Sequence, residues 1–317
     1  VLRNGTVAVS WTDYLVDGDV KGLSARIYSS TGDSLTEPFR LNQFRDGNQY
    51  GAKLLALPNG GIAAVWVSDQ QQDEKSIDII ARLFNSVGQP LTDEIVVSQK
   101  GISANPVLGV AGTRLIIAWE QVDLKDKKKR WDISLKTFDL TLKPLSEQVK
   151  ANEQLEGDQF APRLQGGDSG ALLVWNSLGQ DGSGEAVMGR FITETGVFSD
   201  SEFQVNTRTF AGQLQPSVST DGVDEWLVTW STPQPGDAGM DVVAYAGNGV
   251  ARQIPHSLSK VPEMIWVKRR DSARTWGVYH KGLNGGTNPE QYAIYLDTTQ
   301  AENSSSQWNN TAHTAIN

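Results

Sequence analysis

The chain of 317 residues contains no cysteine. Disulfide bonds therefore contribute nothing to its stability, and any metal site has to be built from oxygen or histidine ligands. A cysteine nucleophile is excluded for the same reason. The sequence also lacks a run of about 18 apolar residues, so we expect no segment that inserts into a membrane.

Basic residues are outnumbered by acidic ones. The formal net charge is −9, which argues against the phosphate backbone of a nucleic acid as the main partner. Apolar residues make up 38% of the chain, a low share for a globular protein, so we expect a thinly distributed core. Ten tryptophans partly compensate, because each indole buries a large apolar area.

Motifs of classical catalysis are scarce. No Gly-x-Ser-x-Gly elbow is present, and the histidines are too far apart for a His-x-x-x-His metal pair. The cluster Tyr279-His280 with Arg269-Arg270 fits acid–base chemistry on an anionic polymer, but ordinary strand and loop residues explain it more simply. Carboxylates that converge from distant repeats stay open as an alternative.

Six tryptophans recur at intervals of 46 to 56 residues, each at the end of an apolar run. A period of this size is typical of solenoids, propellers or arrays. The recurring tryptophans are Trp11, Trp66, Trp119, Trp175, Trp230 and Trp276.

Every repeat contains the same order of segments. The tryptophan strand is followed by a polar loop, a second strand that ends near a Gly turn, and a short strand that ends in Asn or Ser. Proline often opens the next strand, where no ladder donor is needed. The short strands are expected at 39–42, 95–98, 148–152 and 203–206. Four strands without a helical period favour the blades of a β-propeller over a β-helix, helical repeats or separate sandwiches.

The two ends of the chain predict ring closure. Residues 1–5 align with 56–60, so the first repeat lacks most of its first strand, and residues 311–317 are expected to pair with 7–11 and supply it. The sequence therefore predicts one all-β domain over 1–317, a propeller of six four-stranded blades, or seven if the chain is a fragment. The repeats are expected at about 1–47, 48–103, 104–157, 158–211, 212–258 and 259–317.

The pattern is clearest over residues 171–230, where ALLVWNSLGQDGSGEAVMGRF and FQVNTRTFAGQLQPSVSTDG carry nearly every element. It resembles β-propeller repeats of large secreted bacterial surface proteins, many of them adhesin-like or with haemolysin-type calcium-binding repeats elsewhere. The resemblance implies a propeller and says little about function, because propellers include lectins, lyases, hydrolases and scaffolds.

Two Asp-Gly loops occupy the same place in their repeats, after the tryptophan strand. Closely spaced carboxylates and turn carbonyls are the oxygen ligands that calcium takes, whereas Asp and Gly also simply suit tight turns. The turn interpretation is favoured, since the spacing of a strong calcium loop is absent. The candidate calcium ligands are Asp17, Asp19, Asp181 and Glu185.

A basic run, KDKKKR at 125–130, lies in the corresponding loop of the third repeat. It fits a dock for an anionic glycan, or a solvated hairpin tip, which is the usual role of such runs. Exposed indoles stack on sugar rings, whereas Trp226 and Trp266 fit packing between blades. The candidate ligand-binding residues are Lys127, Lys128, Trp131 and Trp308.

Three sequons near the ends of the chain are candidate N-glycosylation sites, at Asn4, Asn303 and Asn309. From these observations we expect a non-catalytic, extracellular or cell-surface propeller. Its partners would be a glycan or a surface protein, within a larger surface assembly. The alternative is a polysaccharide-degrading enzyme, a lyase or a glycoside hydrolase, on the same scaffold. The sequence assigns no cofactor with certainty, and calcium is the candidate.

Overall fold

We describe the protein from a computed structural model, in which residues 1–14, 18, 20–122, 128, 130–209, 211–222, 225–232, 263–267, 277–295 and 303–304 are placed. The chain divides into two compact units, Val1–Thr232 and Pro233–Asn317, each of which is treated by itself. Within the described residues the only helices are two short 3-10 turns, η1 (Leu283–Gly286) and η2 (Pro289–Gln291). Neither has the length or apolarity to cross a membrane.

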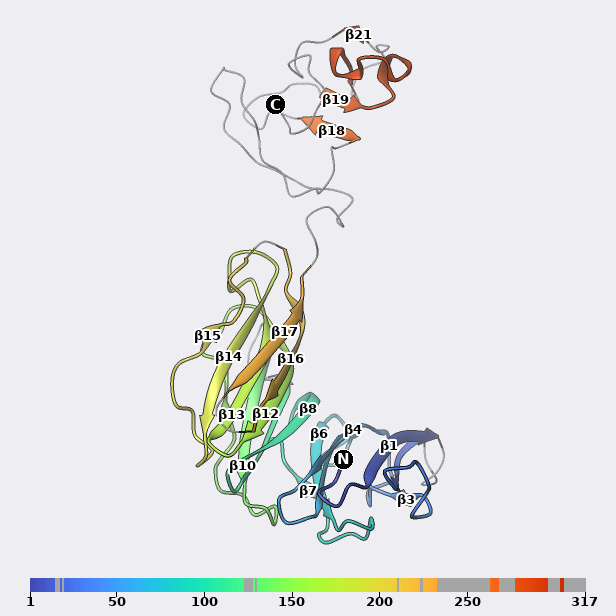
Figure 1. Cartoon of the computed structure of the whole chain (residues 1–317), viewed down its shortest axis with the longest axis vertical. Helices are drawn as coiled ribbons and strands as arrows, with labels where there is room; N and C mark the ends of the chain where they lie inside the picture. Colours follow the sequence, from blue (N-terminus) through green and yellow to red (C-terminus); the bar gives the residue numbers. More distant parts are fainter. Residues whose placement is uncertain are drawn as a thin grey trace. The chain divides into compact units, whose positions relative to one another are not determined.

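The first unit contains antiparallel groups of strands that repeat along the chain, which we call blades 1 to 5 (Figure 1). One parallel pair, Ile77 with Ile102, joins blades 2 and 3 into a single sheet. Blade 1 contains β1 (Val7–Tyr14), β2 (Lys21–Tyr28) and β3 (Phe39–Arg40). Blade 2 contains β4 (Gln49–Ala56), β5 (Ile62–Asp69), β6 (Ile77–Phe84) and β7 (Ile95–Val96). Blade 3 contains β8 (Ile102–Ala111), β9 (Arg114–Val122), β10 (Trp131–Phe138) and β11 (Val149–Lys150).

Blade 4 contains β12 (Gln159–Gly167), β13 (Gly170–Leu178), β14 (Glu185–Thr193) and β15 (Phe203–Gln204). Blade 5 is described for β16 (Leu214–Thr220) and β17 (Trp226–Ser231). The short strands β3, β7, β11 and β15 lie inside the segments expected from the sequence. The first strands β4, β8, β12 and β16 lie beside one another.

The core is divided among the gaps between blades, because the second strands of blades 2, 3 and 4 are buried on both faces. In β5, Ala63 and Val65 pack against blade 3, whereas Ala64 and Trp66 pack against blade 1. A strand covered on both sides has no polar face, which explains the near-continuous apolar runs in the sequence.

The recurring tryptophans lie on the second strands and pack toward the preceding blade. Trp66, Trp119 and Trp175 are fully buried, in the clusters that join them to blades 1, 2 and 3. Trp230 packs against blade 4 and is half-buried. Trp11 in β1 is also half-buried. Trp276 lies outside the described residues.

A side-chain cap recurs at the end of every short outer strand. The side-chain oxygen of Asn42 accepts the backbone N–H of Leu23, 19 residues earlier, at 2.9 Å. Ser98, Asn152 and Asn206 make the same bond, each to a residue 19 positions earlier. The Asn or Ser that ends each repeated segment therefore satisfies a buried backbone donor.

Adjacent blades are also joined by a repeated polar contact. The Glu94 carboxylate of blade 2 accepts the backbone N–H groups of Gln43 and Phe44 in blade 1. Gln148 of blade 3 and Glu202 of blade 4 make the corresponding bonds to Gln99 and Glu153. Each contact satisfies backbone N–H groups that follow a short outer strand. It also joins that blade to its neighbour.

The alignment of the N-terminus with the second repeat is confirmed by hydrogen bonding. Leu2 N–H donates to the Thr6 carbonyl and Leu57 N–H to the Gly61 carbonyl, both at 2.8 Å. Asn4 and Asn59 then cap their turns with the side-chain oxygen. The turn at residues 2–6 therefore corresponds to the turn at 57–61, which precedes the second strand of blade 2.

The second unit contains one four-stranded antiparallel sheet of strands β18 (Met264–Val267), β19 (Gly277–His280), β20 (Tyr292–Tyr295) and β21 (Asn303–Ser304). Its small core holds Ile265, Tyr279 and Ala293. The predicted closing strand, 311–317, lies outside the described residues, and among those described β1 pairs only with β2. The described residues thus form an all-β fold of repeated antiparallel sheets, with two short 3-10 turns as their only helical segments.

Candidate functional site

The candidate calcium loops are partly described. Asp17 and Asp19 lie outside the described residues. The Asp181 carboxylate accepts the Ser183 N–H at 3.1 Å and the Asn206 side-chain amide at 3.0 Å. Among the described residues no three Asp, Glu or His side chains, Glu185 included, come together as a metal site.

The basic loop of blade 3 contacts an acidic residue. Lys128 Nζ lies 3.0 Å from Glu156 Oε2, and an Arg130 guanidinium nitrogen lies 3.1 Å from the same oxygen. The hydrogen bond from Lys128 is the main cause that lowers the pKa of Glu156. Half-buried Trp131 begins β10, and its backbone N–H donates to Asp158. Lys127 and Trp308 lie outside the described residues.

The Tyr279-His280 pair belongs to β19 in the second unit. Tyr279 is buried, whereas His280 accepts the Gly282 N–H at its Nδ1. Arg269 and Arg270 lie outside the described residues, as does the sequon residue Asn309. Of the other sequon residues, Asn4 is exposed in its turn and Asn303 begins β21.

One carboxyl group that the sequence analysis did not single out stands apart. Glu120 follows the buried Trp119 in β9 and is only 5% exposed. Burial raises its pKa, against the lowering effect of hydrogen bonds from Asn105 and Ala161 and of the Arg163 charge. The corresponding positions hold Thr12, Val67, Asn176 and Ser231 in the other blades. The sequence signal for Glu120 was an acidic residue at a strand position that is uncharged in the other blades.

The two oxygens of Glu120 have different surroundings. Its Oε1 accepts the Asn105 side-chain amide at 2.9 Å and the Ala161 backbone N–H at 2.6 Å. For Oε2 the described residues provide no hydrogen-bond partner. Because Oε1 is fully engaged, a proton on this carboxyl group resides on Oε2 and is available for donation.

Both partners of Glu120 occupy β-bulges. Asn105 and Ala161 have positive φ angles of 47° and 53°, where β8 and β12 change register. The first strands β4 and β16 change register at the equivalent place, so the bulge belongs to the repeat and redirects the side chains next to it. Asn105 and Arg163 are exposed beside the buried carboxyl group, so they form the surface by which a ligand would approach it.

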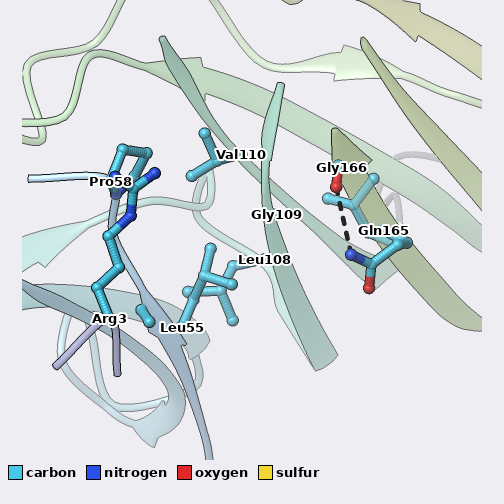
Figure 2. Close-up of a pocket in the computed structure, with 10 residues that line it drawn as sticks. Arg3, Leu55, Pro58, Leu108, Gly109, Val110, Gln165 and Gly166 are labelled. Atoms are coloured by element: carbon cyan, nitrogen blue, oxygen red, sulfur yellow. Dashed lines mark hydrogen bonds between the residues drawn. The ribbon is translucent and has the colours of Figure 1, made fainter. Parts of the chain in front are cut away.

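A cavity of about 230 Å³ lies at the far ends of the same first strands (Figure 2). Its walls come from β4, β8 and β12. The charged lining residue is Arg3, which lies in the N-terminal turn at the position that Pro58 occupies in blade 2. The lining residues are Arg3, Leu55, Ala56, Pro58, Leu108, Gly109, Val110, Leu164, Gln165 and Gly166.

Comparison with known proteins gives a family match and several similar folds. Residues 216–317 match a family described as a domain of unknown function (DUF7483). No curated protein matches the sequence. An α-L-arabinofuranosidase from Fusarium graminearum is similar in structure, with 13% identity, a TM-score of 0.48, and coverage of 96% of this chain and 78% of that chain.

Two further similar structures are also glycoside hydrolases. A thermostable family-43 glycoside hydrolase has 9% identity and a TM-score of 0.45, with 73% of this chain and 81% of that chain covered. An α-L-arabinofuranosidase from Lactobacillus brevis has 11% identity and a TM-score of 0.43, with 72% and 80% covered. At such identities the likeness concerns the fold, and a reaction has to be argued from this chain's own residues.

These comparisons correct the main functional expectation. A non-catalytic binding or structural protein, related to adhesin-like surface proteins, was expected, but the similar solved structures named above are glycoside hydrolases. At TM-scores below 0.5 this likeness describes the fold and assigns no reaction to this chain. The sequence misled because its repeats report the scaffold, and a scaffold does not determine whether its site is catalytic.

Proposed function

We propose that the protein is a polysaccharide-degrading enzyme in which Glu120 donates a proton to the glycosidic oxygen. The observation that carries the proposal is the asymmetry of this buried carboxyl group: Oε1 accepts two hydrogen bonds and Oε2 none among the described residues. A general acid needs a pKa above the usual carboxyl range, and burial shifts the pKa of Glu120 in that direction.

Protonation of the leaving oxygen serves both hydrolysis and β-elimination of a polysaccharide, so Glu120 has the same role in either reaction. Hydrolysis further needs a second carboxylate near the bond that breaks. Elimination instead needs a base that takes the proton from C5 and a neutralised uronate carboxylate, and it leaves a double bond between C4 and C5 in the product. The product therefore distinguishes the two reactions.

The test is an activity assay with the full chain. Arabinan, xylan and acidic polysaccharides are incubated with the protein, while new reducing ends and the ultraviolet absorbance of unsaturated products are followed. We expect release of product by the wild type and a loss of at least about 100-fold in kcat for Glu120→Gln, within the usual contribution of general acid catalysis. Activity of Glu120→Gln equal to the wild type would refute the role.

Glu202→Gln is the matched control. Glu202 is also a carboxylate that accepts a backbone N–H from the neighbouring blade, that of Glu153 at 2.8 Å. If Glu120 acted only by joining blades, Glu202→Gln would lower kcat at least as much, since it replaces one of two engaged oxygens, whereas Glu120→Gln keeps the one engaged oxygen. A selective loss of kcat in Glu120→Gln separates proton donation from packing.

For the fold, we propose a single propeller domain of six blades in which residues 311–317 pair with 7–11. The matched turns at Leu2 and Leu57 support it, as does the exposure of Val9 at 43% and Tyr14 at 71% on β1. Deletion of 311–317 should lower the melting temperature and broaden the transition, because it reopens an edge strand. An unchanged transition, or a concentration-dependent dimer in the wild type, would contradict ring closure.

A further inference from the structure

The cavity at the ends of β4, β8 and β12 has the composition of a sugar-acid site. Leu55 and Leu108 are half-buried apolar residues of the wall (Figure 2). Leu164 is a third half-buried lining leucine, and such apolar surface suits the C–H face of a pyranose ring. At about 230 Å³ the cavity is smaller than the pockets of roughly 300–1,000 Å³ that enclose a drug-sized ligand. It therefore suits one sugar residue.

Gln165 supplies an uncharged polar side chain to the wall. Its side-chain amide donates to the Gly166 carbonyl at 3.2 Å (Figure 2), and its side-chain oxygen can accept from a hydroxyl group. The backbone is closely packed here, since a Cβ on Gly166 would collide with the Val110 carbonyl of β8.

Arg3 gives the cavity its charge. The protein as a whole carries −9, yet no acidic residue is among the lining residues. Arg3 is exposed, and no described residue forms an ion pair with it. A guanidinium that faces a site without acid groups suits a carboxylate, which it can bind through two parallel N–H donors.

We propose that this cavity binds a uronate residue of a polysaccharide, with Arg3 on its carboxylate, Gln165 on a hydroxyl group and the three leucines against its ring. The proposal rests on the proposed function and names its substrate class as an acidic polysaccharide. Ala161, held by Glu120, is three residues from Leu164 along β12, or about 10 Å. The cavity would therefore hold a sugar a short way along the polymer from the bond that breaks.

Binding is measured by calorimetry with trigalacturonate and with its fully methyl-esterified form, which keeps the hydroxyls and loses the charge. The protein used is Glu120→Gln, so that turnover does not consume the ligand. We expect the acid to bind about tenfold or more tightly than the ester, the scale of one charge-assisted hydrogen bond. Its affinity should weaken as salt rises. Equal affinity for acid and ester would overturn the proposal without any further variant.

Arg3→Gln in the same background should lose about tenfold in affinity for the acid and little for the ester. Arg45→Gln is the control, because Arg45 is also an exposed arginine of the first unit and does not line the cavity. An equal loss in both variants would mean non-specific charge attraction and would refute the site. If the wild type degrades only neutral polysaccharides and binds no trigalacturonate, the uronate site fails while the proposed function stands. If trigalacturonate binds through Arg3 but no polysaccharide is degraded, the site stands and the proposed function fails.

Discussion

Glu120 Oε1 accepts the backbone N–H of Ala161, which belongs to the next blade, at 2.6 Å. Ala161 has a positive φ of 53°, a conformation that side chains other than glycine rarely adopt. The Glu120 carboxyl group of blade 3 therefore stabilises a strained bulge in blade 4 through this hydrogen bond. The equivalent residue of blade 4, Asn176, donates a hydrogen bond to the carbonyl of Gln213, which precedes the first strand of blade 5. The strand position after the tryptophan therefore joins each of these two blades to the next one.

The raised pKa of Glu120 predicts a pH dependence of stability. A group whose pKa is higher in the folded state stabilises the fold when protonated, and this contribution is lost as the pH rises through the folded pKa. Glu120→Gln mimics the protonated form at every pH. We expect its melting temperature to equal or exceed that of the wild type at pH 7, with the difference vanishing below the ordinary carboxyl pKa. A variant less stable than the wild type only at pH 7 would reverse the predicted sign.

The burial of Trp175 predicts how much the packing between blades contributes to the free energy of unfolding. It is fully buried between blades 3 and 4, so Trp175→Ala should lower the free energy of unfolding by about 3–5 kcal/mol, the range for deletion of a large core side chain. Half-buried Trp131→Ala should cost clearly less. Urea unfolding followed by circular dichroism measures both, and equal losses would mean that the gap is not the core described here.

The side-chain cap of the short outer strands predicts a graded loss of stability for substitutions at Asn152 in blade 3. Asn152 Oδ1 accepts the buried N–H of Ile133 at 2.9 Å, and Asn152→Ala leaves this donor without a partner, at a cost of about 1–3 kcal/mol. Asn152→Ser should cost less, because Ser98 makes the same bond in blade 2. The comparison is again of unfolding free energies, and an Asn152→Ser loss as large as that of Asn152→Ala would contradict the capping role.

Chelation tests the calcium candidates. The Asp181 carboxylate already accepts two hydrogen bonds, from Ser183 and Asn206. We therefore expect the same melting temperature with a chelator and with added calcium. A melting temperature that falls on chelation and recovers with calcium would show a bound ion by mass action, and Asp17 and Asp19 would then be the first residues to vary.

The sequence by itself determined the strands and their repetition. Apolar runs that end in Trp66, Trp119 and Trp175 report strands buried on both faces, and the recurring Asn or Ser reports a cap within one sheet. Both signals act over distances shorter than one repeat, so they are visible as local pattern.

Only the tertiary structure decided the candidate sites. Glu120 meets Ala161 across 41 residues, and Arg3 lines a cavity with Gly166 of blade 4. No local pattern encodes such contacts, because they depend on how successive blades are placed side by side. The change of functional conclusion has the same cause: periodicity is fixed by the packing of the scaffold, whereas chemistry depends on single side chains that depart from it.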